Sequence, residues 1–506
     1  MNAPTPDTAA RHYVSPHFHA PGDGDTRRDV TNPSTLATVG ARQVTGADTT
    51  ARVLGVANRA QRDWAALDAK TRATYLHAVA YSIDTTDPER ASVLLTSEMG
   101  KPYPESVGEI ANCGGVFRYY AEMARDDAGH VAGTTQAGSF QYAVHEPYGV
   151  SVHILPFNFP ILLMCWTVAA SLAAGNACIV KPAEATTLST LEFMRHFDGL
   201  PPGLVCCLPG DADTARGLVD SPDTHAVAFT GSVAAGRAVA EACGRQLKPC
   251  LVEAGGSDPM IVTATAPLDI AAAGCVTAAF HLSGQICTSA ERFFVVDALH
   301  DAFVERFVAR TLALRVGDGM GRHEIGPLVS EAGRDKVAAL VEEAVAAGAR
   351  IACGGRIPEK AATGWYYEPT ILVDVTPDMR IVRVECFGPV ASVCRVADLD
   401  EAIALANDSA FGLGASIFTT DLEEAMRATR ELAHGMVWVN NPLIDNDALP
   451  FGGWRRSGVG RELGRAGLDA FRQSRMVVVD HVPRLHEWWY PYPDEWFHDA
   501  GGRKLS

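Results

Sequence analysis

The sequence predicts an α/β protein built from two doubly wound parallel sheets in tandem. Short apolar runs such as 177–181 and 226–229 alternate with helical stretches, as expected for buried parallel strands covered by helices. A second series of the same kind begins near residue 259. The chain has 506 residues, which is too long for one hydrophobic core, and two such domains fit this length.

The N-terminal part of the chain is predicted to be a loose arm followed by helices. Residues 1 to about 25 are rich in Pro, Ala, Thr and Asp, so we expect no fixed structure there. Gly100, followed by Pro102, marks the end of one helix. The amphipathic helices are expected at 48–67, 70–83, 88–98 and about 104–124.

The alternating part of the chain contains the predicted strands. The second series begins at 259–262 and continues through helices around 270–282 and 300–315. The polar segment 133–147 alternates like an antiparallel hairpin, and we expect 474–482 to add a strand to it. The first series of strands is expected at 150–156, 177–181, 204–208, 226–229 and 249–254.

Composition indicates a large soluble globular protein and disfavours several kinds of partner. Charged residues make up 20% of the chain and hydrophobic residues 47%. The net charge of −17 repels nucleic acid and anionic membranes. No apolar run approaches the roughly 18 to 20 residues of a membrane span, and the first residues lack the pattern of a secretory signal. We therefore expect a cytoplasmic protein that binds neither nucleic acid nor membrane.

Twelve cysteines raise the question of whether one of them is a nucleophile. None forms a CxxC pair, so we expect reduced thiols, with no disulfide framework and no metal site. Each cysteine taken alone is most simply structural, since free cysteine is among the most buried residue types. Cys287 differs because it follows Gly284 and is flanked by small and polar residues. A nucleophilic thiol needs that kind of access.

Two strand ends carry candidate ligands for a phosphate or a ribose. Gly231 and Ser232 lie in a strand-to-helix turn, where free N–H groups suit a phosphate. The spacing is not GxGxxG, and a simple tight turn is the alternative. Lys181 and Glu184 lie at the carboxyl end of another strand, where open α/β sheets bind ligands. A surface ion pair is the alternative there.

Two further polar residues lie in apolar surroundings. Glu253 ends a predicted strand just before two glycines. A carboxylate there is costly unless it is paired or functional, so it is a candidate general base. Asn158 lies between Phe157 and Phe159 after a buried strand, and its amide either caps a helix or donates to a developing oxyanion. The Gly-rich run at 451–464 mimics a nucleotide loop, but we interpret it as structural.

Seven motifs in one order resemble the aldehyde dehydrogenase superfamily. They are PFNFP, KPAE, FTGS, EAGG, GQICTSAER, ECFGP and PFGGWRRSGVGRELG. The resemblance implies a small β element for oligomerisation and therefore a homodimer or homotetramer. The implied domains are a Rossmann-variant NAD-binding domain at 1–126 and 149–255, a catalytic domain at 256–465, and the oligomerisation element at 127–148 and 466–506.

The resemblance also implies roles for single residues. Cys287 matches the catalytic thiol, Glu253 the general base and Asn158 the oxyanion donor. The implied cofactor contacts are Lys181, Glu184, Gly231, Ser232, Glu385, Phe387 and Phe157. The implied aldehyde contacts are Phe159, Trp166, His281, Ile286, Thr288 and Asp445. A carboxylate at Glu184 would repel a ribose 2′-phosphate, so NAD is expected over NADP, although some members with this glutamate use both.

The implied reaction is the oxidation of an aldehyde to the carboxylic acid with NAD(P)+. It passes through a thiohemiacetal and a thioester on Cys287, followed by hydrolysis. The substrate stays open among aliphatic aldehydes, aromatic aldehydes and semialdehydes. One alternative is a CoA-acylating semialdehyde dehydrogenase, against which Glu253 argues. Another is a catalytically silent scaffold with the same fold, against which the intact set of Cys287, Glu253 and Asn158 argues.

Two departures from the family pattern affect what can be inferred. Thr167 replaces a lysine that assists proton relay in many members, so proton handling is expected to differ. The tail after about 483 is longer than the family core requires and is rich in Trp and Tyr. We expect this tail to lie on its own surface or to dock on a neighbouring subunit.

Overall fold

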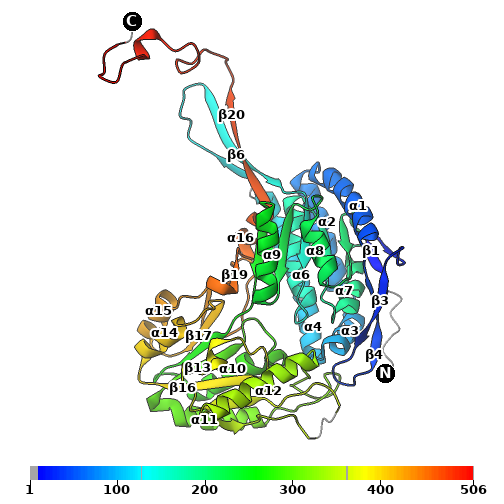
Figure 1. Ribbon diagram of the computed structural model, residues 1–506, viewed down its shortest axis with the longest axis vertical. Helices are drawn as coiled ribbons and strands as arrows, with labels where there is room; N and C mark the ends of the chain where they lie inside the picture. The colour runs from blue at the N-terminus through cyan, green and yellow to red at the C-terminus, as the bar shows by residue number, and fades with distance from the viewer. Residues whose placement is uncertain (1–9, 127, 360–362, 505–506) are drawn as a thin grey trace. The chain divides into compact units, whose positions relative to one another are not determined.

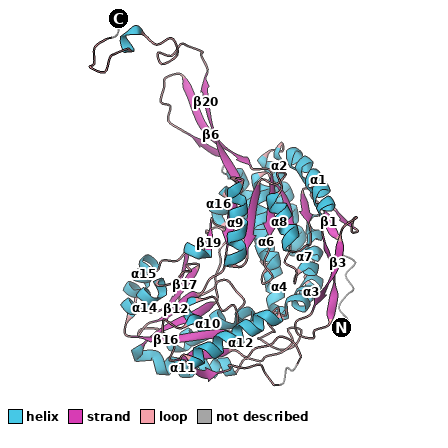
Figure 2. Cartoon of the chain, viewed as in Figure 1, coloured by secondary structure: helices cyan, strands magenta, loops and turns pink. Residues whose placement is uncertain are grey.

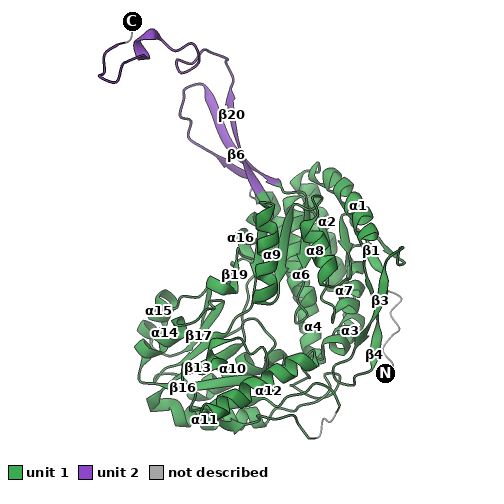
Figure 3. Ribbon diagram, viewed as in Figure 1, with its two compact units in different colours: residues 1–126, 147–472 green, residues 127–146, 473–506 purple. Residues whose placement is uncertain are grey.

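A computed structural model describes residues 10–126, 128–359 and 363–504 of the chain (Figure 1). The chain divides into two units (Figure 3). The larger unit comprises 1–126 and 147–472, and the smaller one 127–146 and 473–506. Helices and strands alternate along the larger unit (Figure 2). No helix in the described ranges is long and apolar enough to cross a membrane.

The first large sheet has eight strands in the order β19-β11-β10-β7-β8-β9-β1-β2. Its five central strands are parallel and almost entirely buried, because each is covered by helices on both faces. These strands are β7 (Val150–Ile154), β8 (Ala177–Lys181), β9 (Val205–Cys207), β10 (Ala226–Thr230) and β11 (Cys250–Glu253). The helices between them are α6 (Pro160–Ala174), α7 (Thr187–Phe193), η1 (Met194–Phe197), α8 (Ala212–Asp220) and α9 (Val233–Arg245).

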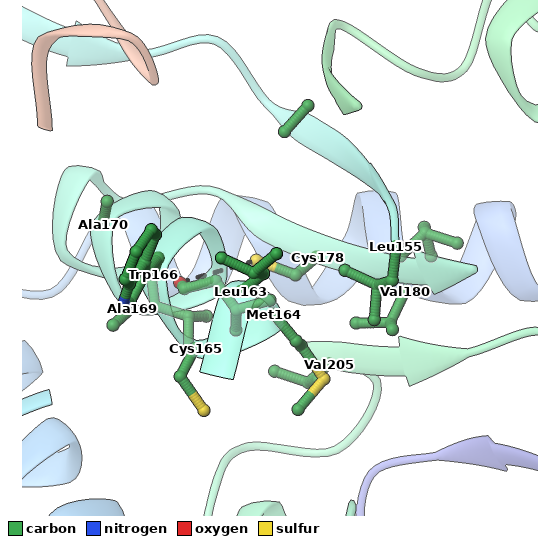
Figure 4. Packing of buried hydrophobic residues seen from close by; sticks show 14 of the residues in the cluster. Leu155, Leu163, Met164, Cys165, Trp166, Ala169, Ala170, Cys178, Val180 and Val205 are labelled. Atoms are coloured by element: carbon green, nitrogen blue, oxygen red, sulfur yellow. Dashed lines mark hydrogen bonds between the residues drawn. The ribbon is translucent and has the colours of Figure 1, made fainter. Parts of the chain in front are cut away.

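The core of this sheet includes the face that α6 covers. Met164 of α6, Cys178 of β8 and Val205 of β9 belong to one cluster of buried side chains (Figure 4). The residues of α6 from Leu163 to Ala173 are all buried. The helix is therefore apolar all round, as expected for a helix inside a large domain.

Antiparallel strands complete both edges of the first sheet. At one edge β1 (His12–Val14) pairs with β9 and with β2 (His17–His19). The prediction of a loose arm is wrong for these strands, because the ring of Tyr13 is buried in the core and its hydroxyl donates to Asp198 at 2.9 Å. The first nine residues of that predicted arm lie outside the described residues. At the other edge β19 (Gly458–Val459) pairs with β11, so the Gly-rich run returns to the first sheet.

The predicted N-terminal helices are present, with one difference. The predicted helix at 104–124 is two helices, because the first ends at Asn112, whose side chain donates to the carbonyl of Gly108 at 3.0 Å. A two-stranded sheet of β3 (Thr26–Thr31) and β4 (Thr38–Val44) precedes them. The helices are α1 (Ala47–Ala65), α2 (Ala69–Thr85), α3 (Glu89–Met99), α4 (Tyr103–Ala111) and α5 (Cys113–Asp126).

The second large sheet has seven strands in the order β14-β15-β16-β13-β12-β17-β18. The strands are parallel except for β14. They are β12 (Asp258–Val262), β13 (Ala290–Val296), β14 (Arg350–Cys353), β15 (Thr370–Val373), β16 (Val390–Val396), β17 (Gly414–Phe418) and β18 (Met436–Val439). The helical elements of this region are α10 (Leu268–Phe280), η2 (His281–Gly284), α11 (Asp297–Leu312), α12 (Glu331–Ala346), α13 (Arg380–Arg383), α14 (Leu399–Asn407), α15 (Leu422–Glu431), η3 (Arg455–Ser457) and α16 (Gly464–Asp469). The prediction of two tandem α/β sheets is therefore confirmed.

Two loops, one from the N-terminal helices and one after α11, meet in a direct backbone contact. The chain just after α3 touches the loop at 317–326. A Cβ on Gly326 would lie 2.0 Å from the carbonyl oxygen of Gly100, and one on Gly319 would lie 2.4 Å from that of Lys101. The N–H of Tyr103 donates to the carbonyl of Gly319 at 2.9 Å. Only glycine lets the two backbones approach this closely.

The smaller unit contains a three-stranded sheet and the C-terminal tail. Its strands, in the order β20-β6-β5, are β5 (Gly129–Val131), β6 (Ser139–Pro147) and β20 (Arg472–Asp480). The predicted hairpin and its added strand are therefore present. In the tail, around η4 (Asp494–Trp496), the aromatic rings contact one another, as Tyr492 and Trp496 do at 5.8 Å. Their exposed fractions run from 37% at Tyr492 to 83% at Tyr490, so the tail buries little of its own apolar area.

Candidate active site

A cavity of about 400 Å³ lies where the central strands of the first sheet end. Lys181 is the last residue of β8, and Glu253 is the last residue of β11. The carboxyl ends of parallel strands meet at one edge of a sheet, which brings these side chains together. The cavity is lined by all ten predicted catalytic and cofactor residues: Cys287, Glu253, Asn158, Lys181, Glu184, Gly231, Ser232, Glu385, Phe387 and Phe157. A larger cavity of about 580 Å³ beside α1 and α8 has none of them in its wall.

Cys287 lies in the loop between η2 and β13, and its backbone path is sterically fixed. Leu282 and Ser283 adopt left-handed backbone angles, with φ of +55° and +57°. Gly284 has φ +72°, and a Cβ there would lie 2.2 Å from the carbonyl oxygen of Gly388. Cys287 is partly exposed, unlike the buried cysteines of the core strands. The loop therefore presents this thiol to the cavity.

The electrostatic surroundings keep the Cys287 thiol protonated in the free protein. Burial raises its pKa well above the usual range, and the negative charges of Glu253, Asp258, Asp445 and Glu385 raise it further. A thiol in such a field needs a base beside it before it can act as a nucleophile.

Glu253, the candidate base, lines the same cavity as the thiol. Its side chain is buried at the end of β11, and its Oε1 has no hydrogen-bond partner among the described residues. Burial raises its pKa well above the ordinary value, as do the charges of Glu462 and Glu385, while a hydrogen bond with Cys287 lowers it. A carboxylate with a raised pKa is a stronger base when it is ionised.

Asn158 is buried in the wall of the same cavity, in the turn between β7 and α6. Its Nδ2 amide has two N–H bonds and donates one to the carbonyl of Gln285 at 2.9 Å. Its Oδ1 accepts the N–H of Phe159 at 3.1 Å. No side chain caps α6 at its N-cap residue, Phe159. The alternative that Asn158 is simply that helix's N-cap is therefore wrong, and its amide faces the cavity.

The cofactor side of the cavity combines a buried cation with a helix N-terminus. Burial lowers the pKa of Lys181 to about 8, against the opposing effect of Glu184. Ser232 caps α9 by accepting the N–H of Ala235 at 3.3 Å. A Cβ on Gly231 would lie 2.8 Å from the ring of Phe229. The close approach of the backbone, the N-terminus of α9 and a lysine fit the phosphate and ribose of a dinucleotide.

The nicotinamide side is built by the second sheet's loops. Burial raises the pKa of Glu385 to about 8, and its Oε1 accepts the N–H of Gly256 at 3.0 Å. The rings of Phe157 and Phe387 meet edge to face at 5.8 Å. The buried carboxylate of Glu291 accepts the N–H groups of Cys386 at 2.9 Å and Phe387 at 2.8 Å. Glu291 thus fixes the loop that carries Glu385 and Phe387.

Four residues that line this cavity or contact its lining residues were not found from the sequence. Arg42 of β4 forms an ion pair with Glu184, and Lys336 of α12 lines the wall. Neither carried a signal, because both lie far along the chain from the residues they approach. Glu291 stands in the CTSAER motif and could have been weighed as a buried carboxylate.

Glu462 is the fourth, and it corrects the interpretation of the Gly-rich run as only structural. Its side chain is buried, its Oε2 is unpartnered within the described chain, and burial raises its pKa to about 8. The charge of Glu462 in turn raises the pKa of Glu253. The pairing of β19 with β11 places this second carboxylate near the candidate base.

The six predicted aldehyde contacts do not line the 400 Å³ cavity. Ile286 and Thr288 flank the thiol and are buried. His281 forms an ion pair with Glu105, with 3.0 Å between Nδ1 and Oε1. Phe159 packs under the Lys101 ammonium, which lies 4.7 Å from the ring centre.

The remaining two contacts, Trp166 and Asp445, lie at a second depression of about 450 Å³ or behind it. Trp166 packs on Phe451, a residue of its wall, with ring centres 4.8 Å apart. Asp445 lines the wall and is exposed, yet burial raises its pKa to about 7, with Asp447 adding to the shift. Both hold for a side chain on a concave wall, open to water on one side and surrounded by protein on the other.

Comparison with known proteins identifies the chain. Its sequence matches the aldehyde dehydrogenase family over residues 19–477. The chain belongs to the aldehyde dehydrogenase family. The predicted family, fold class, enzyme class and nicotinamide cofactor are therefore confirmed.

Aldehyde dehydrogenases of several kinds are similar to this chain. Succinate-semialdehyde dehydrogenase (NADP(+)) 1 of Mycobacterium ulcerans is 39% identical over 418 residues, which cover 81% of this chain and 90% of that protein. Betaine aldehyde dehydrogenase of Rhizobium etli is 37% identical over 480 residues, which cover 94% and 98%. A crystal structure of betaine aldehyde dehydrogenase from Staphylococcus aureus with NAD+ has a TM-score of 0.91 at 28% identity, covering 97% of this chain and 100% of that one.

The relay lysine expected of many aldehyde dehydrogenases is replaced here by a threonine with local partners. Thr167 lies inside α6 and is hydrogen-bonded to Nδ1 of His153 at 2.9 Å. Its hydroxyl also reaches the carbonyl of Met164 at 3.3 Å. Burial lowers the pKa of His153 to about 3, so this histidine stays neutral and carries no proton at neutral pH beyond its own N–H.

Proposed function

We propose that this chain oxidises an aldehyde to its carboxylic acid, with Cys287 as nucleophile, Glu253 as general base and Asn158 as oxyanion donor. The supporting observation is that these three side chains line one cavity together with the seven predicted cofactor contacts. Nucleophile, base and donor must converge on one reacting carbon, and a single cavity is the first requirement for that.

The first half of the reaction forms a covalent adduct on Cys287. Glu253, which lines the same cavity as Cys287, takes the thiol proton, and the sulfur adds to the aldehyde carbon. The oxyanion that develops is held by Nδ2 of Asn158 and by the backbone N–H of Cys287. Removal of one such donor costs about 100- to 1000-fold in rate.

The second half releases the acid. When bound, the nicotinamide ring supplies the acceptor for the hydride that turns the thiohemiacetal into a thioester. The proton that Glu253 took from the thiol is first released to solvent. Glu253 then accepts a proton from water, the water oxygen adds to the thioester carbon, and the Cys287 sulfur leaves and takes that proton from Glu253. The base Glu253 also speaks against transfer of the acyl group to CoA, since an activated water competes for the same carbon.

The cofactor site favours NAD. Lys181 and Glu184 would hold the adenosine ribose, Gly231 and Ser232 the pyrophosphate, and Glu385 the nicotinamide ribose. A free carboxylate at Glu184 would repel a 2′-phosphate, but its ion pair with Arg42 reduces that repulsion. We therefore expect NAD as the preferred cofactor with measurable use of NADP, the cofactor named for the Mycobacterium relative.

The charges around the thiol favour a cationic or neutral aldehyde over an anionic one. The relatives include enzymes named for betaine aldehyde and for succinate semialdehyde, which carry opposite charges. Asp445 is one of four carboxylates whose charge raises the pKa of Cys287. Where these carboxyls ionise, an anionic substrate would add a further negative charge beside them, whereas a cation would offset their charge and favour their ionised forms.

The cations near the aldehyde side are already engaged. Lys101 pairs with Glu109, and Arg118, whose charge lowers the pKa of Asp447, pairs with Asp84. Aromatic rings near this side, such as that of Phe451, suit a cationic or apolar body. The substrate class we propose is an ammonium-bearing or neutral aldehyde, aliphatic or aromatic.

The domain roles, assembly and location follow from the same family. We assign cofactor binding to 1–126 with 149–255, catalysis to 256–465, and oligomerisation to 127–148 with 466–506, in a cytoplasmic homodimer or homotetramer. The exposed apolar side chains of β20, such as Met476, support an assembly role for the last element. All twelve cysteines are free thiols, which suits a reducing compartment.

A panel of aldehydes tests the proposal. Betaine aldehyde, succinate semialdehyde and benzaldehyde would each be supplied with NAD+ or NADP+, with and without CoA, and the acid product identified. We expect NAD+ reduction and free acid without CoA, with betaine aldehyde or benzaldehyde turned over faster than succinate semialdehyde. A CoA requirement would favour the acylating alternative, and no reduction with any aldehyde would favour the silent scaffold.

A further inference from the structure

We propose that Lys101 and Glu109 are positioning residues for the oxyanion donor Asn158. The inference rests on the proposed function, because it concerns how that donor is held. Neither residue touches the cavity that contains Cys287, so their effect on the reaction would pass through Asn158 and its backbone.

Lys101 and Glu109 form an ion pair with both side chains fully buried. A buried ion pair contributes little net stability compared with apolar residues of the same volume, because desolvation offsets the attraction. Stability alone therefore does not account for two charges at this place. Their remaining hydrogen bonds show what else the pair does.

Lys101 holds the turn through its ammonium group. Its Nζ donates to the backbone carbonyl of Asn158 at 2.7 Å and lies 4.7 Å from the ring centre of Phe159. The same ammonium thus holds both residues of the turn. Lys101 itself is immobilised, since its own backbone carbonyl is packed against Gly319.

Glu109 holds the start of α6, which follows this turn, through its carboxylate. Its Oε1 accepts the N–H groups of Ile161 at 2.8 Å and Leu162 at 3.0 Å, which are free donors in the first turn of α6. Pro160, the first residue of α6, has no N–H to donate. Glu109 therefore accepts the N–H groups that an N-cap side chain would otherwise accept, and it fixes where α6 begins.

The ion pair therefore holds the segment Asn158–Phe159–Pro160 at two points, the backbone carbonyl of Asn158 and the first turn of α6. The Asn158 side chain adds its own bond to the carbonyl of Gln285 at 2.9 Å, two residues before Cys287. With the backbone held by Lys101 and the helix start held by Glu109, the amide keeps one distance from the thiol. A misplacement of about 1 Å can cost on the order of 100-fold in rate.

A double-mutant cycle on the full-length protein tests the inference. The variant Lys101→Met/Glu109→Gln keeps volume and removes both charges, so no unpaired charge is buried. We expect its pre-steady-state burst of NADH formation to slow by about 10- to 100-fold, with the NAD+ dissociation constant unchanged within about twofold. In an Asn158→Ala background the same change should slow the burst by less than about twofold, because the donor it positions is gone.

A matched control separates positioning from general packing. Glu98 is also a buried carboxylate that accepts two consecutive N–H groups, those of Leu188 and Ser189, at the start of α7, away from Asn158. We expect Glu98→Gln to lower thermal stability while leaving the burst rate within about twofold. An equal slowing by Glu98→Gln, or an equal slowing by the charge-free pair with and without Asn158, would overturn the inference.

The two proposals fail in distinguishable ways. If Asn158→Ala left the burst unchanged, the donor role itself would be wrong. If Asn158→Ala slowed the burst but the charge-free pair did not, only the positioning role would be wrong. Should the charge-free pair not fold, Lys101→Met alone removes the hold on the Asn158 carbonyl, and the buried Glu109 can take up a proton and keep an acceptor oxygen for α6. This variant then stands in the same cycle, with an expected slowing of about 3- to 10-fold.

Discussion

The two sides of Cys287 differ in how their residues are brought together. On the cofactor side, every predicted contact lines one cavity. On the aldehyde side, the six predicted contacts are spread over four segments. These are α6 with the residue before it, η2, the loop between η2 and β13 that carries Cys287, and the loop at 440–450. The first side follows from sheet topology, since strand ends converge. The second depends on how separate helices and loops pack.

This difference also appears in the electrostatics. The cofactor side offers cations, Lys181 and the partnered Arg42, near a helix N-terminus. The aldehyde side offers carboxylates, with the pKa of Asp445 raised to about 7. A dinucleotide pyrophosphate and a cationic aldehyde would therefore reach the thiol from walls of opposite charge. Substitutions can break or sharpen this contrast.

Removal of the Cys287 sulfur, which the cofactor side and the aldehyde side share, should have the largest effect. We expect Cys287→Ala to lower kcat/KM for aldehyde oxidation by about 10⁴-fold or more, as loss of a nucleophile does elsewhere. NAD+ binding should remain, because no cofactor contact is changed. Steady-state NADH formation and fluorescence titration with NAD+ measure the two properties. Substantial residual turnover would remove Cys287 from the role of nucleophile.

The next largest effect is expected at Glu253, which borders both sides. Glu253→Gln should slow thioester hydrolysis by about 10²- to 10⁴-fold while a burst of NADH persists. Only the ionised carboxylate accepts a proton, and its pKa is raised well above the ordinary value. Hydrolysis in the unaltered enzyme should therefore speed up as pH rises through this raised pKa, and the variant should lose this rise. Rapid-quench measurements of acyl-enzyme decay across pH check both points.

A smaller effect is expected on the aldehyde side alone. Asp445→Asn should lower kcat/KM for betaine aldehyde by about tenfold, roughly 1.4 kcal/mol, and leave benzaldehyde within about twofold. The preference for the cation in the unaltered enzyme should grow as pH rises through about 7, where Asp445 ionises. KM for NAD+ should not change. A matched loss for both aldehydes would mean that Asp445 acts on packing and not on substrate charge.

The smallest effect on chemistry is expected from the tail. Truncation after Pro483 removes aromatic residues that are between 37% and 83% exposed. We expect a change in oligomer mass or in KM for the aldehyde, with kcat within about twofold. Light scattering and steady-state kinetics report on these quantities. Unchanged mass and unchanged KM would exclude the tail from both assembly and substrate entry.

The sequence predicted the two sheets and the three-stranded element because their strands are continuous apolar or alternating runs. It predicted Cys287, Glu253 and Asn158 because each stands at a strand end or turn within a motif. It missed β1 and β2, since a Pro- and Ala-rich composition resembles a loose arm until Tyr13 is seen in the core. Local pattern does not reveal a partner strand more than 190 positions away, as β9 is for β1.

The site residues that were not predicted share one property: each acts on residues that lie far away along the chain. Arg42 reaches Glu184 across 142 positions, and Glu291 holds the loop at Cys386 across 95. A long side chain reaching across the fold carries no local periodicity. Glu462 was visible in the Gly-rich run, but only the pairing of β19 with β11 shows that it stands near the base Glu253.

The contact of Gly100 and Lys101 with Gly319 and Gly326 bears on how the enzyme denatures. Because the loop after α3 and the loop at 317–326 meet there through backbone atoms, they cannot separate without disturbing Lys101, which holds the Asn158 carbonyl. Both sheets should therefore melt together, with calorimetric and van't Hoff enthalpies in agreement over the larger unit. Gly326→Ala would loosen this joint, and a second heat-absorption peak should then appear. Loss of the position of Asn158, the proposed oxyanion donor, and with it activity, would accompany the lower of the two peaks.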